Sequence, residues 1–171
     1  MQLFTLRKWQ LSDLDSLMKH ADNRKIADRL TDQFPHPYTR ESGEGFLKMA
    51  MAKDPPNVFA IDVEGEAVGC IGIFPQEDIH RLNAEMGYWL SESYWGRGIM
   101  TAAIRRMVDY GFSTFDIIRI YARPFGTNLA SQRVLEKAGF TCEARFEKVL
   151  IKNGELLDEI VYGIRRATHN L

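Results

Sequence analysis

The spacing of the hydrophobic residues changes along this chain of 171 residues, and this change limits the folds it can adopt. Up to about residue 50, apolar residues recur three or four positions apart, which is typical of amphipathic helices. From residue 58 to residue 90 the period changes to two, which is typical of strands. After residue 90, segments with the helical period alternate with segments of period two. The chain must therefore combine helices with a mixed sheet, a combination that we class as α+β.

The expected elements follow in the order β, α, α, α, β, β, β, α, β, α, β, β. Ser12 and Thr39 are placed as N-caps of early helices, and Asn153-Gly154 is a strong hairpin signal between the last two strands. The helix between strands 83–90 and 116–122 makes these two strands a parallel crossover pair. Expected strands are 3–7, 58–63, 67–74, 83–90 and 116–122, and expected helices include 24–30, 98–115 and 128–138.

Length and charge restrict the possible functions. At 171 residues one domain spanning 1–171 is expected. Lys and Arg number 22 against 23 Asp and Glu, so no global field draws the protein to nucleic acid or to an anionic membrane. Cys70 and Cys142 have no metal-site or redox spacing and are expected to be buried, which fits the cytoplasm. The alternatives of a monomer and a homodimer both stay open.

The loop between strand 83–90 and helix 98–115 contains two glycines, Gly96 and Gly98. Glycine permits positive φ and a close approach of the backbone to a ligand. The following helix offers unpaired N–H groups and a positive dipole end, which together favour a phosphate or pyrophosphate. A tight turn explains the same residues. No Lys follows Gly98 as an NTP-binding loop requires, and Thr101 stands where a dinucleotide motif has its third glycine.

A second polar pair, Asn128 and Ser131, opens the helix 128–138, and Gly139 stands at its C-terminal end. Asn128 is a good N-cap, which is a sufficient structural reason for it. A hydroxyl in the first helical turn, such as that of Ser131, usually faces solvent or bonds back to the helix. Later in the same helix, Arg133 and Lys137 form either a solvated face or a phosphate contact.

In combination, the segments 84–90, 95–101 and 128–140 resemble the GNAT superfamily of acetyl-CoA-dependent N-acetyltransferases, and most of all its ribosomal-protein N-acetyltransferase branch. The resemblance covers nearly the whole chain. It implies a mostly antiparallel central sheet with a splayed parallel strand pair, flanked by helices, and a bulge near Gly87. Two positions depart from the superfamily loop pattern, since Trp95 takes its first place and Met100 its last.

The resemblance also implies the roles of individual residues. Pantetheine would pair with the backbone near Trp89 and Leu90, loop amides would hold the CoA pyrophosphate, and Asn128 would touch the pantetheine arm. Ser131 would lie near the sulfur and protonate the leaving thiolate. The residues implied to bind acetyl-CoA are Trp89, Leu90, Trp95, Gly96, Arg97, Gly98, Ile99, Met100, Thr101 and Asn128.

Two roles are open for Glu85, the candidate general base. Glu85 shares a strand face with Gly87 and Trp89, where apolar neighbours would raise its pKa and let it relay a proton. Alternatively, Glu85 is an ion-paired strand carboxylate.

These residues predict transfer of an acetyl group from acetyl-CoA to a primary amine in a ternary complex. A non-catalytic CoA-binding regulatory domain is the alternative, and a nucleotide-dependent phosphotransferase is disfavoured by the missing Lys. The histidines at 20, 36, 80 and 169 have no ligand spacing, so we expect surface or loop positions and no metal. The resemblance implies that the acceptor enters between the 32–38 loop and the last hairpin, with Asp32, Phe34 and Tyr38 as candidate lining residues.

Overall fold

A computed structural model describes residues 4–166. The chain contacts cluster into two compact units. The first comprises the described residues up to Gly72 together with Tyr88–Ala103, and the second comprises Ile73–Gly87 and the described residues from Ile104 onward. Two strands and one helix run from one unit into the other: β3 (Glu66–Pro75), β4 (Asn83–Leu90) and α4 (Ile99–Thr114). That a single domain spans 1–171 stays a prediction.

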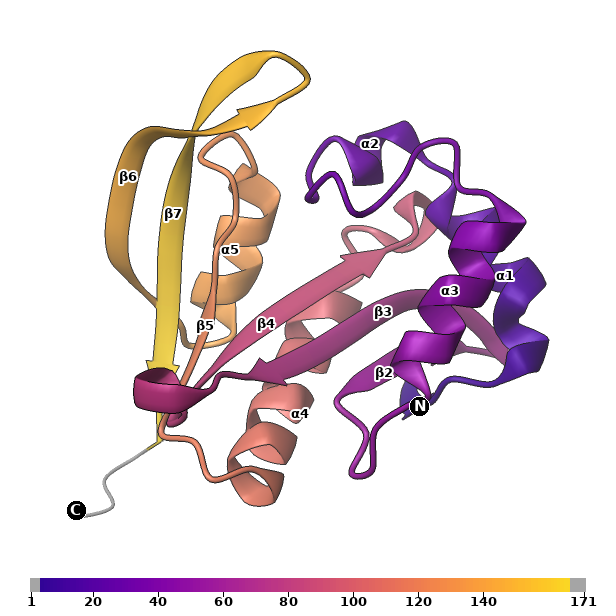
Figure 1. The fold of residues 1–171 in the computed structure, drawn as a ribbon, viewed down its shortest axis with the longest axis horizontal. Coiled ribbons are helices and arrows are strands. Elements are labelled where there is room, and N and C mark those ends of the chain that lie inside the picture. Colours follow the sequence, from indigo (N-terminus) through magenta and orange to yellow (C-terminus); the bar gives the residue numbers. More distant parts are fainter. Residues whose placement is uncertain (1–3, 167–171) are drawn as a thin grey trace. The chain divides into compact units, whose positions relative to one another are not determined.

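The first unit contains the antiparallel strands β1 (Thr5–Lys8), β2 (Val58–Val63) and the first part of β3. Helices α1 (Leu14–Ala21) and α3 (Arg40–Ala50) pack against each other (Figure 1). Between α1 and α3 in the sequence, the chain forms the four-residue helix α2 (Arg24–Ala27), which is shorter than the expected 24–30. Buried residues of these helices and strands form one apolar core, which includes Leu17, Ile26, Leu47, Val58, Ala60, Ala67 and Trp89.

Helix starts in this unit were predicted with mixed success. Thr39 accepts a hydrogen bond from the backbone N–H of Ser42 and caps α3 as expected. Ser12 does not cap α1, so that prediction was wrong. The segment Leu11–Asp13 is a 3₁₀ turn, and Gln10 and Asp13 form a reciprocal capping box in front of it. The carboxylate of Asp13 outcompetes a Ser hydroxyl because it also binds a nearby arginine side chain.

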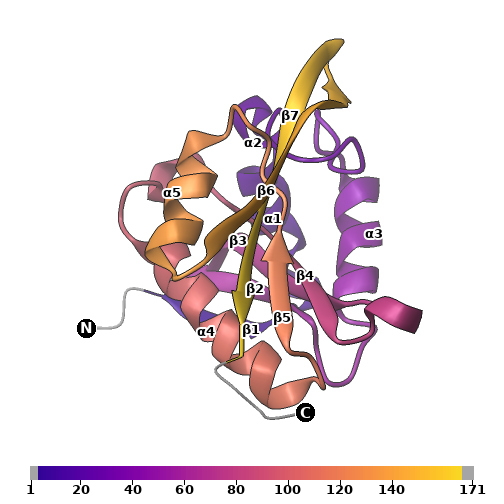
Figure 2. The ribbon, with the colours of Figure 1, turned by 90° about the vertical axis from the view of Figure 1, so that its left-hand side faces the viewer.

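The second unit contains β5 (Arg119–Ala122), β6 (Thr141–Lys152), β7 (Glu155–Arg165), helix α5 (Leu129–Lys137) and most of α4. Helix α5 lies alongside the β6–β7 hairpin in both ribbon views (Figures 1 and 2). The hairpin turns at Asn153 and Gly154, both with positive φ, as this residue pair predicts. Strand β5 begins three residues later than expected.

The hydrogen-bonded strands follow the order β1-β2-β3-β4-β5-β7-β6. Strands β4 and β5 run parallel, which confirms the predicted crossover pair, whereas the pairs β1–β2, β2–β3, β5–β7 and β6–β7 are antiparallel. The α+β prediction is therefore confirmed. The β4–β5 ladder pairs Asn83, Ala84 and Glu85 with Arg119, Ile120 and Tyr121.

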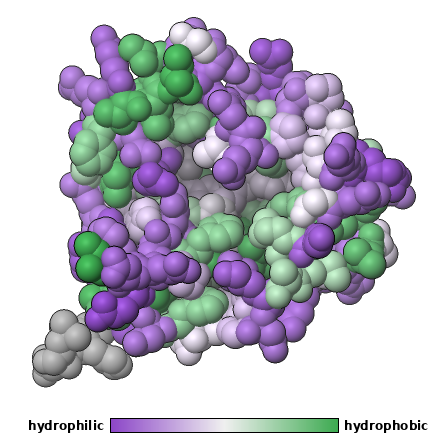
Figure 3. All heavy atoms as spheres, in the orientation of Figure 1, coloured by the Kyte–Doolittle hydropathy of each residue, from purple (hydrophilic) through white to green (hydrophobic). Residues whose placement is uncertain are grey.

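Apolar side chains remain exposed on the β6–β7 hairpin. Figure 3 shows hydrophobic residues gathered over its outer end. They include Val149, Ile151 and Leu156, with exposed fractions of 56%, 68% and 61%. Among the described residues, no helix is both long and apolar enough to cross a bilayer.

Candidate functional site

The loop between β4 and α4 has the backbone geometry that the two glycines predict. Gly96 and Gly98 have φ of +74° and +75°, and a Cβ on either would have no heavy atom within 4 Å. Backbone conformation, rather than crowding, therefore requires glycine at both positions. The first hydrogen bond of α4 runs from the N–H of Ala102 to the carbonyl of Gly98. The preceding amides, at Ile99, Met100 and Thr101, are those that a helix start leaves unpaired.

The side chains of this loop are held in place by the protein. Ile99 and Met100 are buried, whereas Gly96, Arg97 and Gly98 are exposed. The indole Nε1–H of Trp95 donates to the carbonyl of Leu90 over 2.7 Å. An exposed backbone stretch is thus anchored on both sides by buried or hydrogen-bonded side chains, which is an arrangement suited to presenting amides to an anion.

Two arginines stack on aromatic rings at this loop. The guanidinium carbon of Arg29 lies 5.3 Å from the Trp95 ring centroid, and that of Arg97 lies 5.1 Å from the Tyr94 centroid. Both distances are within the range of cation–π contacts. Arg29 and Tyr94 were not singled out from the sequence, because Arg29 is distant in the chain and no local pattern links it to the loop. Together the arginines add positive charge beside the loop amides.

The last two residues of β4 are both buried. Trp89 and Leu90 have exposed fractions of 8% and 6%. Trp89 packs into the core of the first unit. Gly69 allows the backbones of β3 and the end of β4 to approach each other closely. A Cβ at this position would lie 2.7 Å from the Trp89 carbonyl oxygen and 3.1 Å from the Cα of Leu90.

In the second unit, Glu85 is held in a bidentate ion pair. Its Oε1 and Oε2 accept hydrogen bonds of 2.9 and 3.0 Å from Arg123, and a second carboxylate, Glu159, lies 3.5 Å from the same guanidinium. The hydrogen bonds to Glu85 raise the pKa of Arg123. Nearby, partial burial and then the charge of Glu85 raise the pKa of Tyr121. This geometry matches the ion-pair reading of Glu85, and the partners Arg123 and Glu159 were not foreseen from the sequence.

Asn128 caps α5, as its residue type predicts. Its Oδ1 accepts the backbone N–H of Ser131 over 3.2 Å. The preceding loop is fastened to β7, since the N–H of Gly126 donates to the carbonyl of Asp158 over 2.8 Å. A Cβ on Gly126 would lie 2.9 Å from the Cβ of Asp158. The side-chain amide of Gln132 also donates to the carbonyl of Gly126. The backbone that carries Asn128 and Ser131 is therefore well fixed.

The site residues expected from the sequence divide between the two units. Those from Trp89 to Thr101 lie together at the β4–α4 loop of the first unit. Glu85, Asn128 and Ser131 belong to the second unit. Of the candidate acceptor residues, Phe34 packs 5.2 Å from the ring of Tyr38 and 5.9 Å from that of Trp89. Tyr38 is buried, which raises its pKa to about 12, so its role here is packing.

Two expectations about titratable residues were wrong. His20 is buried with 8% exposure, because its ring lies against Ser91 and Tyr94. Cys142 is exposed on β6, whereas Cys70 is buried as expected. His169 lies outside the described residues. Within residues 4–166, no group of three or more His, Cys, Asp or Glu side chains could hold a metal ion.

The sequence and the fold of this chain are similar to those of known proteins. The family model of the acetyltransferase (GNAT) domain matches residues 4–141. The uncharacterized N-acetyltransferase YoaA of Bacillus subtilis (strain 168) is 37% identical over 99 residues, a match that spans 58% of this chain and 55% of that protein. The uncharacterized N-acetyltransferase YnaD of the same organism is 32% identical over 161 residues, 93% of this chain and 91% of that protein.

Among solved structures, the chain is similar to RimL, a ribosomal L7/L12 alpha-N-protein acetyltransferase in complex with coenzyme A. The TM-score is 0.84 at 21% identity, and the match covers 96% of this chain and 95% of RimL. At that identity the likeness concerns the fold. The family model covers most of the chain and YnaD nearly all of it. The chain belongs to the GNAT acetyltransferase family.

Proposed function

We propose that this protein transfers the acetyl group of acetyl-CoA to a primary amine, by direct attack within a ternary complex. The observation that carries the proposal is the β4–α4 loop, where two glycines with positive φ precede the start of a 16-residue helix. Loop amides and a helix N-terminus form a site for phosphate oxygens. In a GNAT chain the expected anion is the pyrophosphate of CoA.

The proposal assigns each part of the cofactor to residues of this chain. Backbone amides from Gly96 to Thr101 hold the pyrophosphate, and the backbone at Trp89 and Leu90 pairs with pantetheine. Asn128 contacts the pantetheine arm. The positive charge of Arg97 supports binding of the phosphates. Family membership and the bound coenzyme A of the RimL structure support this assignment.

The chemistry needs few groups from the protein. A neutral amine attacks the thioester carbonyl, the N–C bond forms, and the C–S bond breaks. The developing oxyanion is stabilised by a backbone N–H at the end of β4. The CoA thiolate takes a proton from Ser131, and the proton that the attacking nitrogen releases as the amide forms restores the Ser131 hydroxyl, so that Ser131→Ala lowers kcat modestly. The acceptor amine must lose a proton before attack, and the bidentate pair with Arg123 favours a positioning role for Glu85 rather than that of the base.

The test has two measurements. Isothermal titration with CoA checks binding, and release of free thiol checks turnover with acetyl-CoA and a panel of amines, including peptides with free N-termini, polyamines and amino sugars. Binding with no turnover across the panel would favour a regulatory CoA-binding domain. Absence of CoA binding would refute the proposal.

A matched pair of variants separates a specific effect of the loop on CoA binding from the effect of backbone strain in general. Gly98 and Gly65 both have positive φ, +75° and +89°, and both have open space where a Cβ would lie. Gly98→Ala and Gly65→Ala therefore introduce similar strain into the same unit. We expect only Gly98→Ala to weaken CoA binding. Equal loss in both variants would remove the loop from the binding site.

A further inference from the structure

Two buried polar residues of the first unit, His20 and Ser91, contact each other, and neither has a role in the proposed function. Their exposed fractions are 8% and 6%. The Nδ1 atom of His20, on α1, lies 2.9 Å from the Oγ of Ser91, the residue that follows β4. Burial of polar groups is unfavourable unless they are hydrogen-bonded. His20 and Ser91 meet this requirement by bonding to each other, and the bond joins α1 to the end of β4.

The groups around His20 determine which of its two ring nitrogens carries the proton. His20 Nε2 lies 3.1 Å from Glu66 Oε1 on β3. Glu66 also pairs with Lys19 over 2.7 Å, and that contact lowers the pKa of the Glu66 carboxyl. A carboxylate facing Nε2 favours the tautomer with the proton on that nitrogen. Nδ1 is then an acceptor, and the hydroxyl of Ser91 donates to it.

Further contacts hold the same short stretch of backbone. The N–H of Ser91 donates to the carbonyl of Val68 over 2.9 Å, and the N–H of Tyr94 donates to the carbonyl of Ser91 over 2.9 Å. The Leu90 carbonyl accepts the Trp95 indole, and Gly69 lies directly against the Trp89 carbonyl. The Ser91 hydroxyl does not cap the 3₁₀ turn that follows it, Glu92–Tyr94. Its side chain is instead committed to His20.

We infer that His20 and Ser91 are positioning residues that set the orientation of the Trp89–Leu90 backbone and thereby the affinity for acetyl-CoA. The inference rests on the proposed function, which assigns this backbone to pantetheine. Neither side chain is assigned to the reacting atoms. A misplaced pantetheine contact weakens binding of acetyl-CoA and raises KM, and a misplaced oxyanion donor at the same end of β4 lowers kcat.

The first measurement does not depend on CoA. Hydrogen exchange is followed by mass spectrometry in peptides that contain residues 89–91 of the full-length protein. Ser91→Ala removes the contact with His20, so we expect faster exchange there. Ser16→Ala is the control, because it also removes one serine hydroxyl bond, of 2.9 Å to the Asp13 carbonyl, within the same unit. Unchanged exchange at 89–91 in Ser91→Ala would overturn the inference.

The second measurement compares conservative variants at both positions. We expect Ser91→Ala to raise KM for acetyl-CoA about fivefold, the factor that one hydrogen bond typically contributes, and to lower kcat as well. Ser91→Thr keeps the hydroxyl and should restore KM. His20→Asn retains an acceptor near the Nδ1 position, whereas His20→Gln reaches toward the Nε2 position instead. His20→Asn should therefore resemble the wild type more closely than His20→Gln does.

The outcomes separate the two proposals. Wild-type protein that binds no CoA refutes the proposed function and the cofactor part of this inference, while hydrogen exchange still tests the positioning of the backbone. If the wild type binds CoA and Ser91→Ala has only a lower Tm with an unchanged KM, the contact is merely structural and the inference fails. Equal behaviour of His20→Asn and His20→Gln would also contradict it.

Discussion

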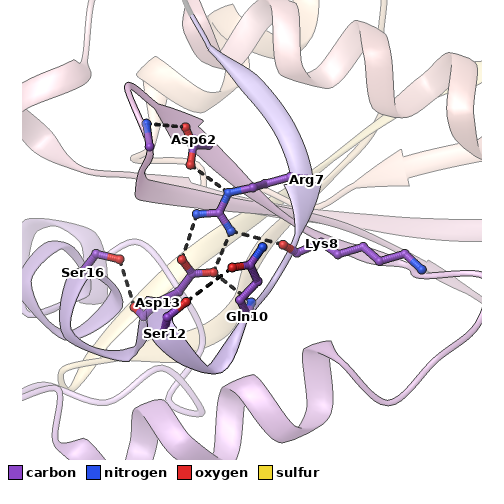
Figure 4. Close-up of polar contacts among 8 residues, drawn as sticks. Arg7, Lys8, Gln10, Ser12, Asp13, Ser16 and Asp62 are labelled. Atoms are coloured by element: carbon purple, nitrogen blue, oxygen red, sulfur yellow. Dashed lines mark hydrogen bonds and ion pairs between the residues drawn. The ribbon is translucent and has the colours of Figure 1, made fainter.

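One arginine side chain bridges two buried carboxylates in the first unit. Arg7, on β1, points between Asp13 and Asp62 (Figure 4). Its Nε donates to Asp62 over 2.8 Å, and its Nη atoms donate to both oxygens of Asp13 over 2.7 and 2.8 Å. These contacts raise the pKa of Arg7. Asp13 and Asp62 are only 6% and 8% exposed, so the arginine compensates two charges that are largely shielded from water.

Replacing Arg7 should therefore destabilise the fold strongly. Arg7→Leu leaves both carboxylates buried without their cation, and breaking such a pair typically costs about 3 kcal/mol or more. The exposed pair of Arg40 and Asp15 is the control, with side chains 59% and 88% exposed. Arg40→Leu should cost less than about 1 kcal/mol. Urea unfolding checks both, and similar losses in the two variants would contradict the prediction.

Glu85 provides a second prediction at the scale of single residues. Both of its carboxylate oxygens accept hydrogen bonds from Arg123. Glu85→Gln removes one charge from this pair, and we expect kcat for acetyl transfer to fall by less than about tenfold with CoA affinity unchanged. Steady-state thiol release measures this. A decrease on the order of 10²-fold would assign Glu85 the role of the base after all.

Helix α5 shows how one residue supports an element. Asn128 accepts the N–H of Ser131 at the start of the helix, and Gly139 has φ of +99° just past its end. These two residues bound a helix of nine residues. Because short helices are marginal by themselves, the cap and the contacts with β7 determine whether the helix start is ordered.

The capping role of Asn128 can be separated from its proposed contact with CoA. Asn128→Ala removes both and should cost about 1 kcal/mol of stability as well as CoA affinity. Asn128→Ser retains a capping oxygen but loses the amide. We expect Asn128→Ser to recover the Tm and not the CoA affinity, measured by thermal melts and by calorimetry. If affinity returns together with the Tm, Asn128 acts only as a cap.

Strand positions in the second unit should differ sharply in how much stability is lost when their side chain is truncated. Ile120, on β5, has no exposed surface, whereas Ile151, on β6, is 68% exposed. Ile120→Ala creates a cavity and should cost about 2–5 kcal/mol. Ile151→Ala removes the same atoms from a solvated face and should stay within about 0.5 kcal/mol. Chemical denaturation compares the two, and a large loss for Ile151→Ala would show that its face is covered.

At the scale of the whole molecule, burial of titratable groups makes stability depend on pH in alkaline solution. Burial raises the pKa of the Cys70 thiol to about 12 and that of the Tyr38 phenol to about 12. Both groups are neutral below their unfolded pKa values, near 8.5 and 10. Their folded pKa values are higher, so the folded state binds more protons in alkaline solution and stability falls as pH rises.

We expect the free energy of unfolding to decrease between about pH 8.5 and pH 12. Cys70→Ser should reduce the slope in the lower part of this range. Cys142→Ser is the control, because Cys142 is exposed. Urea unfolding at a series of pH values provides the slopes. Identical slopes in the wild type and Cys70→Ser would refute the assignment to Cys70.

Much of the fold was predictable from the sequence because the relevant forces act between near neighbours in the chain. Hydrophobic period, helix caps and turn residues located most of the elements, including β4, the hairpin at Asn153-Gly154 and the cap at Asn128. The errors lie where a distant partner competes with a local one. At Ser12, the capping function passed to Gln10 and Asp13, because the Asp13 carboxylate also binds Arg7.

The sequence by itself determined the order of the elements, the glycine-containing loop before α4 and the family, since each depends on short-range patterns. Only the tertiary structure decided which side chains meet. It placed His20 against Ser91, 71 positions away, and Arg123 against Glu85, 38 positions away. Burial and pairing of polar groups depend on residues that the chain brings together from afar, and no local period records such contacts.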